Sequence, residues 1–315
     1  HIGNARPLVV FDVLVRLLRK IYPKVTYVRN ITDIDDKINK RAIEKKINIS
    51  ELTNETIKNF HKDAHALGNL KPDFEPKATD HISEMIEMIE TLISNGFAYV
   101  SSGNVLFAVE KYNNYGALSG RSLDEMISGS RVEVAEYKKN PGDFILWKPS
   151  SEKLPGWDSP WGRGRPGWHI ECSAMSKKYL GTQFDIHAGG LDLIFPHHEN
   201  EMAQSCCANE SDIMANYWLH NGYVTSDGEK MSKSLGNFAT INNLLLNFRG
   251  EAIRYSLMQA QYRAPLSFNK KSLDEATKSL SRLYRAVEGF EVNDGQDTQI
   301  IDNLCDDLNS PKALA

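Results

Sequence analysis

The chain is poor in cysteine, with four thiols among its 315 residues, at Cys172, Cys206, Cys207 and Cys305. So few thiols exclude a small secreted scaffold held by disulfides, and they favour the reducing conditions of the cytoplasm. Long hydrophobic runs are also missing, because runs such as 105–109 fall far short of the roughly 18 apolar residues that a membrane span needs. We therefore expect a cytoplasmic protein with no membrane partner.

Neither sign of charge dominates, since 37 basic and 41 acidic side chains leave a net charge of −4. This balance argues against unselective binding to polyanions through counterion release, and it leaves open a specific nucleic-acid partner met by a local basic surface. The length and the 41% share of hydrophobic residues suffice for about two domains with a buried core. Because the chain starts with His1 and stops at Ala315 within an expected helix, we expect a piece of a longer protein.

The period of the hydrophobic pattern changes along the chain. Helical periodicity recurs in the segments 5–20, 50–68 and 79–95, and further helices are expected near 170–180 and from about 197 to 208. Short β-like runs at 24–31 and 184–187 alternate with these helices, which predicts an α/β fold with a parallel sheet that binds ligands at its strand carboxyl ends. Between 97 and 165 the period becomes two, with a hairpin at 98–109.

These changes suggest a division of the chain. We expect residues 1–96 and 166–225 to form two halves of one catalytic domain, interrupted by a connective insertion at 97–165. A signature loop and helices that contact an RNA stem would follow at 226–286. Residues 287–315 would form a linker and the start of a further helical domain.

Two short motifs fit phosphate chemistry. His-Ile-Gly-Asn at residues 1–4 puts a glycine before a helix whose free N–H groups can meet a phosphate, although four residues recur by chance. Lys-Met-Ser-Lys-Ser at 230–234 puts two lysines three apart among small and hydroxylated residues, which suits a mobile clamp on a triphosphate. A bare pair of lysines would instead indicate a solvated turn, and the longer string argues against that alternative.

Three further strings accompany them: Asn-Ile-Thr-Asp-Ile-Asp-Asp-Lys at 30–37, Gly-Trp-His-Ile-Glu-Cys-Ser-Ala-Met at 167–175 and Phe-Pro-His-His-Glu-Asn-Glu at 195–201. With all five in this order, the chain resembles the class I aminoacyl-tRNA synthetases and, among them, the cysteinyl-tRNA synthetases. The resemblance implies a Rossmann-like sheet with an inserted connective subdomain and a mainly helical region after it. It also implies that an N-terminal strand and a C-terminal anticodon-binding region lie outside this chain.

The residues around 200 offer metal ligands. His197 and Glu201 stand four apart on an expected helix and share a face, and a Cys172 thiolate would complete a set of N, O and S donors that zinc accepts. The same residues also fit a polar helix face beside a buried cysteine. The resemblance implies that all three ligate one Zn²⁺ per chain, with a fourth ligand from a cysteine shortly before His1.

A physical need supports zinc in such an enzyme. Serine has nearly the shape of cysteine, and a hydrophobic pocket discriminates poorly between near isosteres. A thiolate binds zinc far better than an alcohol does, so the substrate's own sulfur supplies selectivity. In this interpretation the metal is a recognition device with an open position, and no editing domain is needed.

The resemblance also implies roles for residues that contact ATP. It assigns ATP contacts to His1, Gly3, Asn4, Lys230 and Lys233, with His1 and both lysines as catalytic residues that act together with Mg²⁺. Asn4 stands where the family has a second histidine; an asparagine still donates a hydrogen bond but carries no positive charge.

For the amino-acid side, the resemblance implies four substrate-binding residues. Thr32 and Asp192 would contact the amino acid, Trp168 would shape the floor of its pocket, and His187 would lie near the adenylate. On the residues alone, Thr32 also fits a helix N-cap and Trp168 also fits a core aromatic.

The implied reaction is ATP-dependent activation of L-cysteine and transfer to the terminal adenosine of cysteine tRNA, by a monomeric ligase. The basic helix at 270–286 and the insertion are the expected stem contacts, although a solvated helix face explains the same charges. Two rivals stay open. One is a related ligase of mycothiol synthesis that passes activated cysteine to an amino sugar, and the other is a non-catalytic RNA-binding paralogue.

Overall fold

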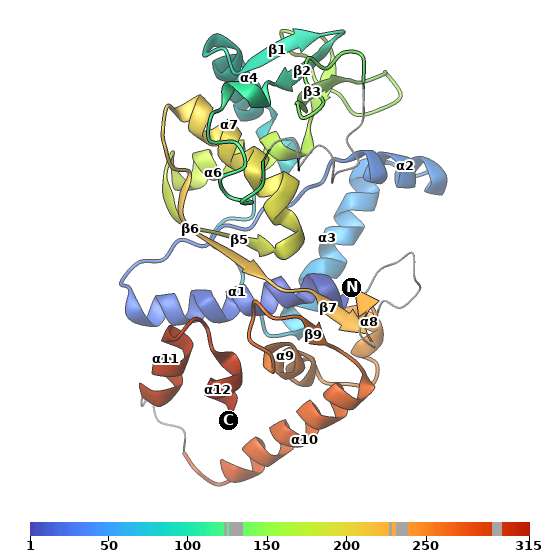
Figure 1. The fold of residues 1–315 in the computed structure, drawn as a ribbon. Coiled ribbons are helices and arrows are strands. Elements are labelled where there is room, and N and C mark those ends of the chain that lie inside the picture. The colour runs from blue at the N-terminus through green and yellow to red at the C-terminus, as the bar shows by residue number, and fades with distance from the viewer. Residues whose placement is uncertain (123–124, 126–134, 227–228, 231–238, 292–297) are drawn as a thin grey trace.

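The computed structural model describes residues 1–315 apart from 123–124, 126–134, 227–228, 231–238 and 292–297 (Figure 1). The described helices are α1 (Ile2–Ile21), α2 (Asp36–Lys45), α3 (Ile49–Ala66), α4 (Ile82–Ser94), α6 (Trp168–Leu180), α7 (Glu199–Asn209), α8 (Ile241–Leu244), α9 (Gly250–Met258), α10 (Lys270–Ala286), α11 (Thr298–Cys305) and α12 (Ser310–Leu314). The described strands are β1 (Ala98–Ser101), β2 (Asn104–Phe107), β3 (Phe144–Pro149), β4 (Gly164–Pro166), β5 (Phe184–Gly190), β6 (Ala215–Asn221), β7 (Val224–Ser226), β8 (Glu229–Lys230) and β9 (Leu266–Ser267). None of these helices combines the length and hydropathy that crossing a membrane requires.

Parallel strand pairing confirms the α/β fold. β5 pairs in parallel with β6, in a register that places His187 opposite Trp218 and Gly189 opposite His220. The chain crosses from β5 to β6 through α7, as a parallel connection requires. The carboxyl ends of both strands therefore meet at one edge, where Gly190 pairs with Asn221.

The strand expected at 24–31 is wrong. This segment makes only two isolated parallel bridges, Val28 to Phe74 and Ile31 to Lys77. Ile31 N–H does donate to the carbonyl of Pro76, but a proline has no N–H to return, so the ladder cannot extend there. The Tyr27 N–H goes to the Asp73 carboxylate instead of a strand partner.

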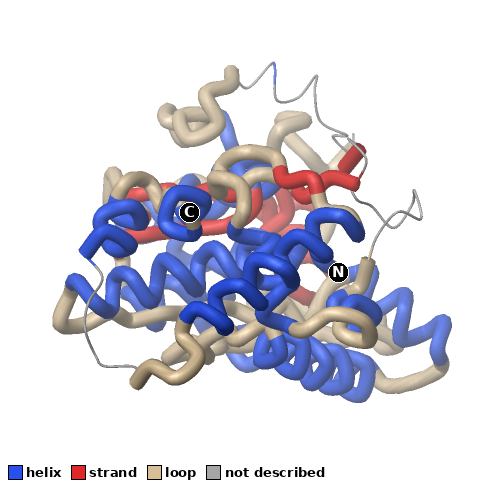
Figure 2. Tube along the Cα trace, turned by 90° about the horizontal axis from the view of Figure 1, so that it is seen from below, coloured by secondary structure: helices blue, strands red, loops and turns tan. Residues whose placement is uncertain are grey.

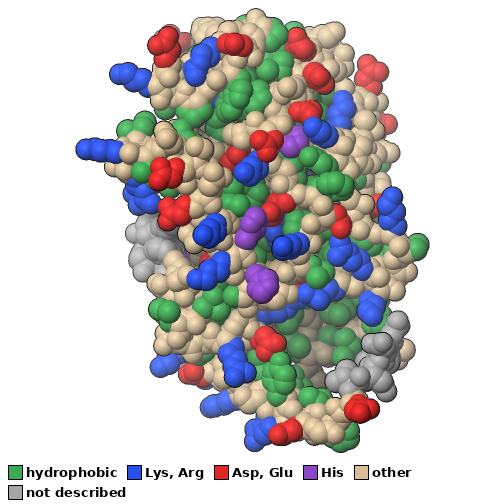
Figure 3. Space-filling view, turned by 180° about the vertical axis from the view of Figure 1, so that it is seen from behind, with side chains coloured by type: hydrophobic (Ala, Val, Ile, Leu, Met, Phe, Trp, Pro, Cys, Tyr) green, Lys and Arg blue, Asp and Glu red, His purple; other side chains and the backbone are tan. Residues whose placement is uncertain are grey.

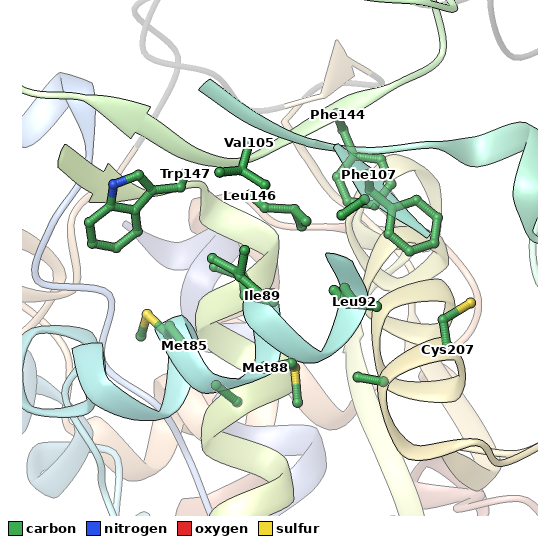
Figure 4. Packing of buried hydrophobic residues seen from close by; sticks show 14 of the residues in the cluster. Met85, Met88, Ile89, Leu92, Val105, Phe107, Phe144, Leu146, Trp147 and Cys207 are labelled. Atoms are coloured by element: carbon green, nitrogen blue, oxygen red, sulfur yellow. The ribbon is translucent and has the colours of Figure 1, made fainter. Parts of the chain in front are cut away.

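The segment expected as an insertion forms an antiparallel sheet in the order β1-β2-β3-β4. Its buried residues Phe107, Leu146 and Trp147 pack against α4, where Ile89 and Leu92 are fully buried (Figure 4). The same cluster includes residues of α6 and α7. The sheet therefore shares its core with the helices that carry the site residues, and each large apolar side chain buried there contributes about 1.5–3 kcal/mol.

A second core lies below, where α1 packs on α9. Ile2, Val9, Ile253 and Leu257 are buried there, and Figure 2 shows helices over most of the face seen from below. Arg6 on α1 is fully buried, and its guanidinium donates to the carbonyls of Tyr223 and Gln261. Burial lowers the pKa of Arg6 to about 10, and these two bonds fasten α1 to the chain around β7.

Candidate metal and nucleotide centre

Three donors from α6 and the start of α7 converge. Cys172 lies on α6, Glu201 lies in the first turn of α7, and His197 lies on one π-helical turn (Ile194–His198) that directly precedes α7. Cys172 Sγ is 3.6 Å from His197 Nε2, which is 2.9 Å from Glu201 Oε1. One donor atom of each residue lies within 4.8 Å of the other two. We call these residues the Cys/His/Glu cluster.

The helix expected from 197 begins instead at Glu199. His197 therefore lies before the helix, but it stays within 2.9 Å of Glu201. Phe195 has extended backbone angles, so the chain enters the π-helical turn abruptly. Gln204 on α7 donates to the carbonyl of His169 and to the Ser173 hydroxyl, both at 3.0 Å, and this ties α7 to α6.

Two further histidines, His169 and His187, contact members of the cluster. His197 Nδ1 is 2.9 Å from His169 Nδ1, and Glu201 Oε2 is 3.1 Å from His187 Nε2. Burial lowers the pKa of His169 to about 3, so its ring is neutral, and the two Nδ1 atoms share one hydrogen bond. Such a bond through the second ring nitrogen sets the tautomer of a ligating histidine. His197 Nε2 is the ring nitrogen that faces Cys172 and Glu201.

The charges of the cluster differ between its members. Burial acts to raise the pKa of Glu201, but its electrostatic interactions and hydrogen bonds with His197 and His187 outweigh burial and hold that pKa well below its usual range. Burial raises the pKa of the Cys172 thiol well above its usual value, and the carboxylates of Glu201 and Glu171 add to the rise. The cluster thus holds an anion at Glu201 and favours a protonated sulfur, a preference that a bound cation inverts.

A second histidine pair lies beside the cluster. His198 Nδ1 is 2.8 Å from His220 Nε2, and burial lowers the pKa of His198 to about 2 and that of His220 to about 4. A Cβ atom on Gly189 would lie 2.9 Å from the His198 ring, so a glycine is needed where β5 passes this close. His187, His198 and Glu201 form a second set of close donors, which has no sulfur.

Sequence reasoning missed His169, His198 and His220. His169 stands three residues before Cys172 on one helix, and His198 follows His197 directly, so both positions carried a spacing signal. The partnership of His198 with His220 carried none, because it depends on the parallel register of β5 and β6.

The Trp168 ring stacks on His197, with centroids 4.0 Å apart and planes at 24°. Its 46% exposure excludes the alternative of a core aromatic. Thr32 is not a helix cap, because Asp35 caps α2 by accepting from Lys37 N–H. The Thr32 side chain instead hydrogen-bonds Glu171, a buried carboxyl whose pKa burial raises well above its usual value.

His187 lies midway along β5, and Asp192 lies just past its carboxyl end. His187 is on the strand itself, and Asp192 is on the single 3-10 turn Leu191–Leu193 that follows it. His187 therefore touches the Cys/His/Glu cluster, whereas Asp192 lies in the turn beyond it, toward Tyr223.

The first motif lies at the N-terminus of α1. His1 caps the helix, with Nδ1 accepting from Gly3 N–H at 3.2 Å, and a Cβ atom on Gly3 would come within 2.9 Å of that imidazole. Asn4 is exposed on the same turn. Ile2 N–H donates to the carbonyl of Ala239 at 2.9 Å, so α1 begins beside the chain that follows the second motif. Lys230 ends β8, and Lys233 lies outside the described residues.

Comparison with known proteins decides the family. Residues 1–278 match the model of the class I (C) tRNA synthetase catalytic domain. A cysteine–tRNA ligase of Rhodospirillum rubrum is 59% identical over 319 residues, which cover all of this chain and 70% of that protein. The chain belongs to the class I tRNA synthetases.

Other comparisons agree with this membership. A cysteine–tRNA ligase of Gluconobacter oxydans is 57% identical over 317 residues, again covering all of this chain and 70% of the relative. The solved methionyl-tRNA synthetase of Mycobacterium tuberculosis, in complex with methionyl-adenylate, superposes on the whole synthetase chain described here with a TM-score of 0.74 at 15% identity. At that identity the likeness concerns the fold, which is the class I α/β fold. The chain is thus a ligase of the aminoacyl-tRNA synthetase type.

Proposed function

We propose that this synthetase activates L-cysteine with ATP and transfers it to the terminal adenosine of cysteine tRNA. The observation that carries the proposal is the convergence of a sulfur, a nitrogen and an oxygen donor in the Cys/His/Glu cluster. A synthetase for cysteine needs such a set, because only a soft metal-binding site separates a thiol from the hydroxyl of serine. The names of the relatives support the same amino acid.

The donor set fits zinc. Bond lengths of about 2.3 Å to sulfur and 2.0–2.1 Å to nitrogen in a tetrahedral site place the two donors roughly 3.6 Å apart. Cys172 Sγ and His197 Nε2 are separated by 3.6 Å, and Glu201 Oε1 lies 2.9 Å from the same nitrogen, so all three donors can meet one ion. Cys172, His197 and Glu201 would hold one Zn²⁺ per chain. When bound, the ion would supply a Lewis acid that prefers the substrate thiolate over a hydroxyl.

In the first step, an oxygen of the substrate carboxylate forms a bond to the α-phosphorus of ATP, and the bond to pyrophosphate breaks in line. His1, Lys230 and Lys233 stabilise the charge that develops on the phosphates, together with the Mg²⁺ that accompanies ATP. The backbone at Gly3 and the exposed Asn4 amide add neutral donors at the positive end of the α1 dipole. Since Asn4 carries no charge, the two lysines bear more of the neutralisation.

In the second step, a ribose hydroxyl of the tRNA attacks the carbonyl of cysteinyl-adenylate, and AMP leaves. No side chain serves as a nucleophile, so the enzyme acts by positioning and electrostatics. Thr32 and Asp192 orient the amino acid, Trp168 covers the pocket beside His197, and His187 lies near the adenylate. The mechanism thus depends on groups held before the substrate arrives.

The tRNA would contact the insertion at 97–165 and the exposed face of α10. That face carries five basic side chains, at Lys270, Lys271, Lys278, Arg282 and Arg285. Basic and acidic side chains mix over the face seen in Figure 3, so binding depends on such a local patch. We propose that one chain is the working unit and that the divisions at 96, 165, 225 and 286 bound its parts.

The test is cysteine-dependent exchange of labelled pyrophosphate into ATP by the full-length protein, with zinc measured on the same sample. Exchange with cysteine, little with serine, and about one zinc per chain are the expected results. Absence of exchange from a folded, zinc-loaded protein overturns the proposal in favour of a non-catalytic paralogue. Transfer to an amino sugar instead of tRNA would identify the mycothiol ligase.

A further inference from the structure

Asn30 contacts the Cys/His/Glu cluster from a distant part of the chain. Its side-chain amide Nδ2 lies 3.4 Å from Cys172 Sγ and donates a hydrogen bond to the sulfur. The two residues are 142 positions apart in the sequence. Neither the motifs nor the proposed mechanism gave Asn30 a role, although it opens the string that contains Thr32.

The backbone around Asn30 is fastened on both sides. Arg29 N–H donates to the carbonyl of Phe74 at 3.1 Å, and Ile31 N–H donates to the carbonyl of Pro76 at 2.8 Å. Asn30 is itself exposed, so no packing of its side chain accounts for where the amide points. The anchored backbone therefore delivers the amide to the sulfur.

The surroundings of Cys172 give that bond a chemical purpose. Two buried carboxyls, Glu171 and Glu201, lie near the sulfur and oppose negative charge on it. The Asn30 amide has the opposite effect on the sulfur, because a neutral N–H donor stabilises an anionic sulfur. Hydrogen bonds of this kind orient metal ligands and tune how strongly the ligand donates to the metal.

We propose that Asn30 is a positioning residue, which holds the Cys172 sulfur by an N–H···S hydrogen bond and lowers the electron donation of that sulfur to the metal. A sulfur that donates less leaves the site more electrophilic toward a second thiolate, the one that the substrate brings. Asn30 thereby contributes to the selection of cysteine. This inference rests on the proposed function for its consequence and on the cluster geometry for the bond itself.

The test compares Asn30→Ala and the isosteric Asn30→Asp with wild type, and uses Asn54→Ala on the exposed surface of α3 as the matched control. Zinc affinity is measured by competition with a chelator, and the thiolate-to-metal charge-transfer band is recorded on Co²⁺-loaded protein. We expect zinc binding to weaken by about 10–100-fold in Asn30→Ala, because loss of the positioned sulfur outweighs its stronger donation to the metal. The band moves to lower energy, because a sulfur without the N–H bond gives up an electron more easily. Asn30→Asp shifts the band further without changing side-chain size.

A kinetic split gives a second readout. The KM for cysteine rises in Asn30→Ala while kcat changes little, because the positions of ATP and its lysines are untouched. A band and a zinc affinity equal to those of Asn54→Ala overturn the inference, and so does a wild-type protein that binds no metal. A raised KM with an unchanged band also overturns it, since that result makes Asn30 a substrate contact.

The two proposals fail separately. A shifted band in a protein without cysteine-dependent exchange keeps the role of Asn30 at the sulfur and sinks the proposed function. Normal exchange with an unshifted band supports the proposed function and rejects the role of Asn30. If Asn30→Ala proves unstable to heat, Asn30→Asp alone decides, because it keeps the shape of the side chain.

Discussion

The Cys/His/Glu cluster and the proposed nucleotide site at the start of α1 are built in opposite ways. The cluster is assembled from buried side chains, with His197 and Glu201 exposed by 4% and 1% and further histidines packed behind them. The end of α1 is assembled from backbone, through the Ile2 bond to Ala239 and the His1 cap, with Asn4 exposed. A buried site depends on the correct partner for each atom, whereas an exposed one depends on charge brought to the right place.

The largest expected effect comes from removing the soft donor of the cluster. Cys172→Ser should lose stoichiometric zinc and reduce cysteine-dependent pyrophosphate exchange below about one thousandth of wild type, because an alcohol is a poor zinc ligand. Zinc content and exchange measured together check this. Cys305→Ser removes an exposed, remote thiol and should change neither. A zinc-loaded, active Cys172→Ser protein would show that the cluster does not need the Cys172 sulfur to bind zinc.

The proposed nucleotide site, to which Lys230 and Lys233 belong, should respond in the opposite pattern. Lys230→Ala and Lys233→Ala should each lower kcat by about 10²–10³-fold, as loss of a charge that stabilises the transition state does. Zinc content and the KM for cysteine should stay at wild-type values, because the cluster is untouched. Lys40→Ala on the exposed side of α2 serves as the control. Loss of zinc from either lysine variant would mean that the two regions are coupled.

A third variant tests how the cluster helix is held. Glu199 is fully buried and accepts the N–H groups of Gly116 and Ser119 at 2.9 and 2.8 Å. Glu199→Gln should lower the free energy of unfolding by about 1–3 kcal/mol, because an amide cannot accept both bonds with the same charge. Denaturant titration measures it, with the exposed Glu90→Gln as control. Equal stability of the two variants would mean that the hydrogen bonds of Glu199 do not contribute to the free energy of unfolding.

The smallest effect belongs to a half-exposed ion group. Burial acts to raise the pKa of Asp36, but hydrogen bonds from Lys148 and Arg165 lower it below the ordinary 3.8. A depressed carboxyl pKa stabilises the fold above pH 3.8, and this contribution is lost as the pH falls through the depressed value. Asp36→Asn should therefore cost about 0.2–1 kcal/mol at neutral pH. The difference in thermal stability from wild type should vanish in acid, and a constant difference would point to another cause.

Sequence patterns predicted much of the fold, and their errors have physical causes. The helices around Val9 and Ile89 follow from apolar residues on one face, a local property. The strand expected at 24–31 failed because its partner segment carries Pro76, and the sequence of one segment does not reveal the donors of the other. The helix start moved from 197 to Glu199 because the chain first makes a π-helical turn.

For the site, the sequence predicted the donor residues but not the residues that contact and position them. The sequence by itself predicted Cys172, His197 and Glu201 as donors, through the family resemblance and, for His197 and Glu201, through a spacing of one helical turn, whereas the tertiary structure decided that Cys172 lies beside them. Only the tertiary structure decided that His198 meets His220 and that Asn30 reaches Cys172. These contacts join segments far apart in the chain, and their geometry depends on strand register and anchored backbone, which no local pattern of residues encodes.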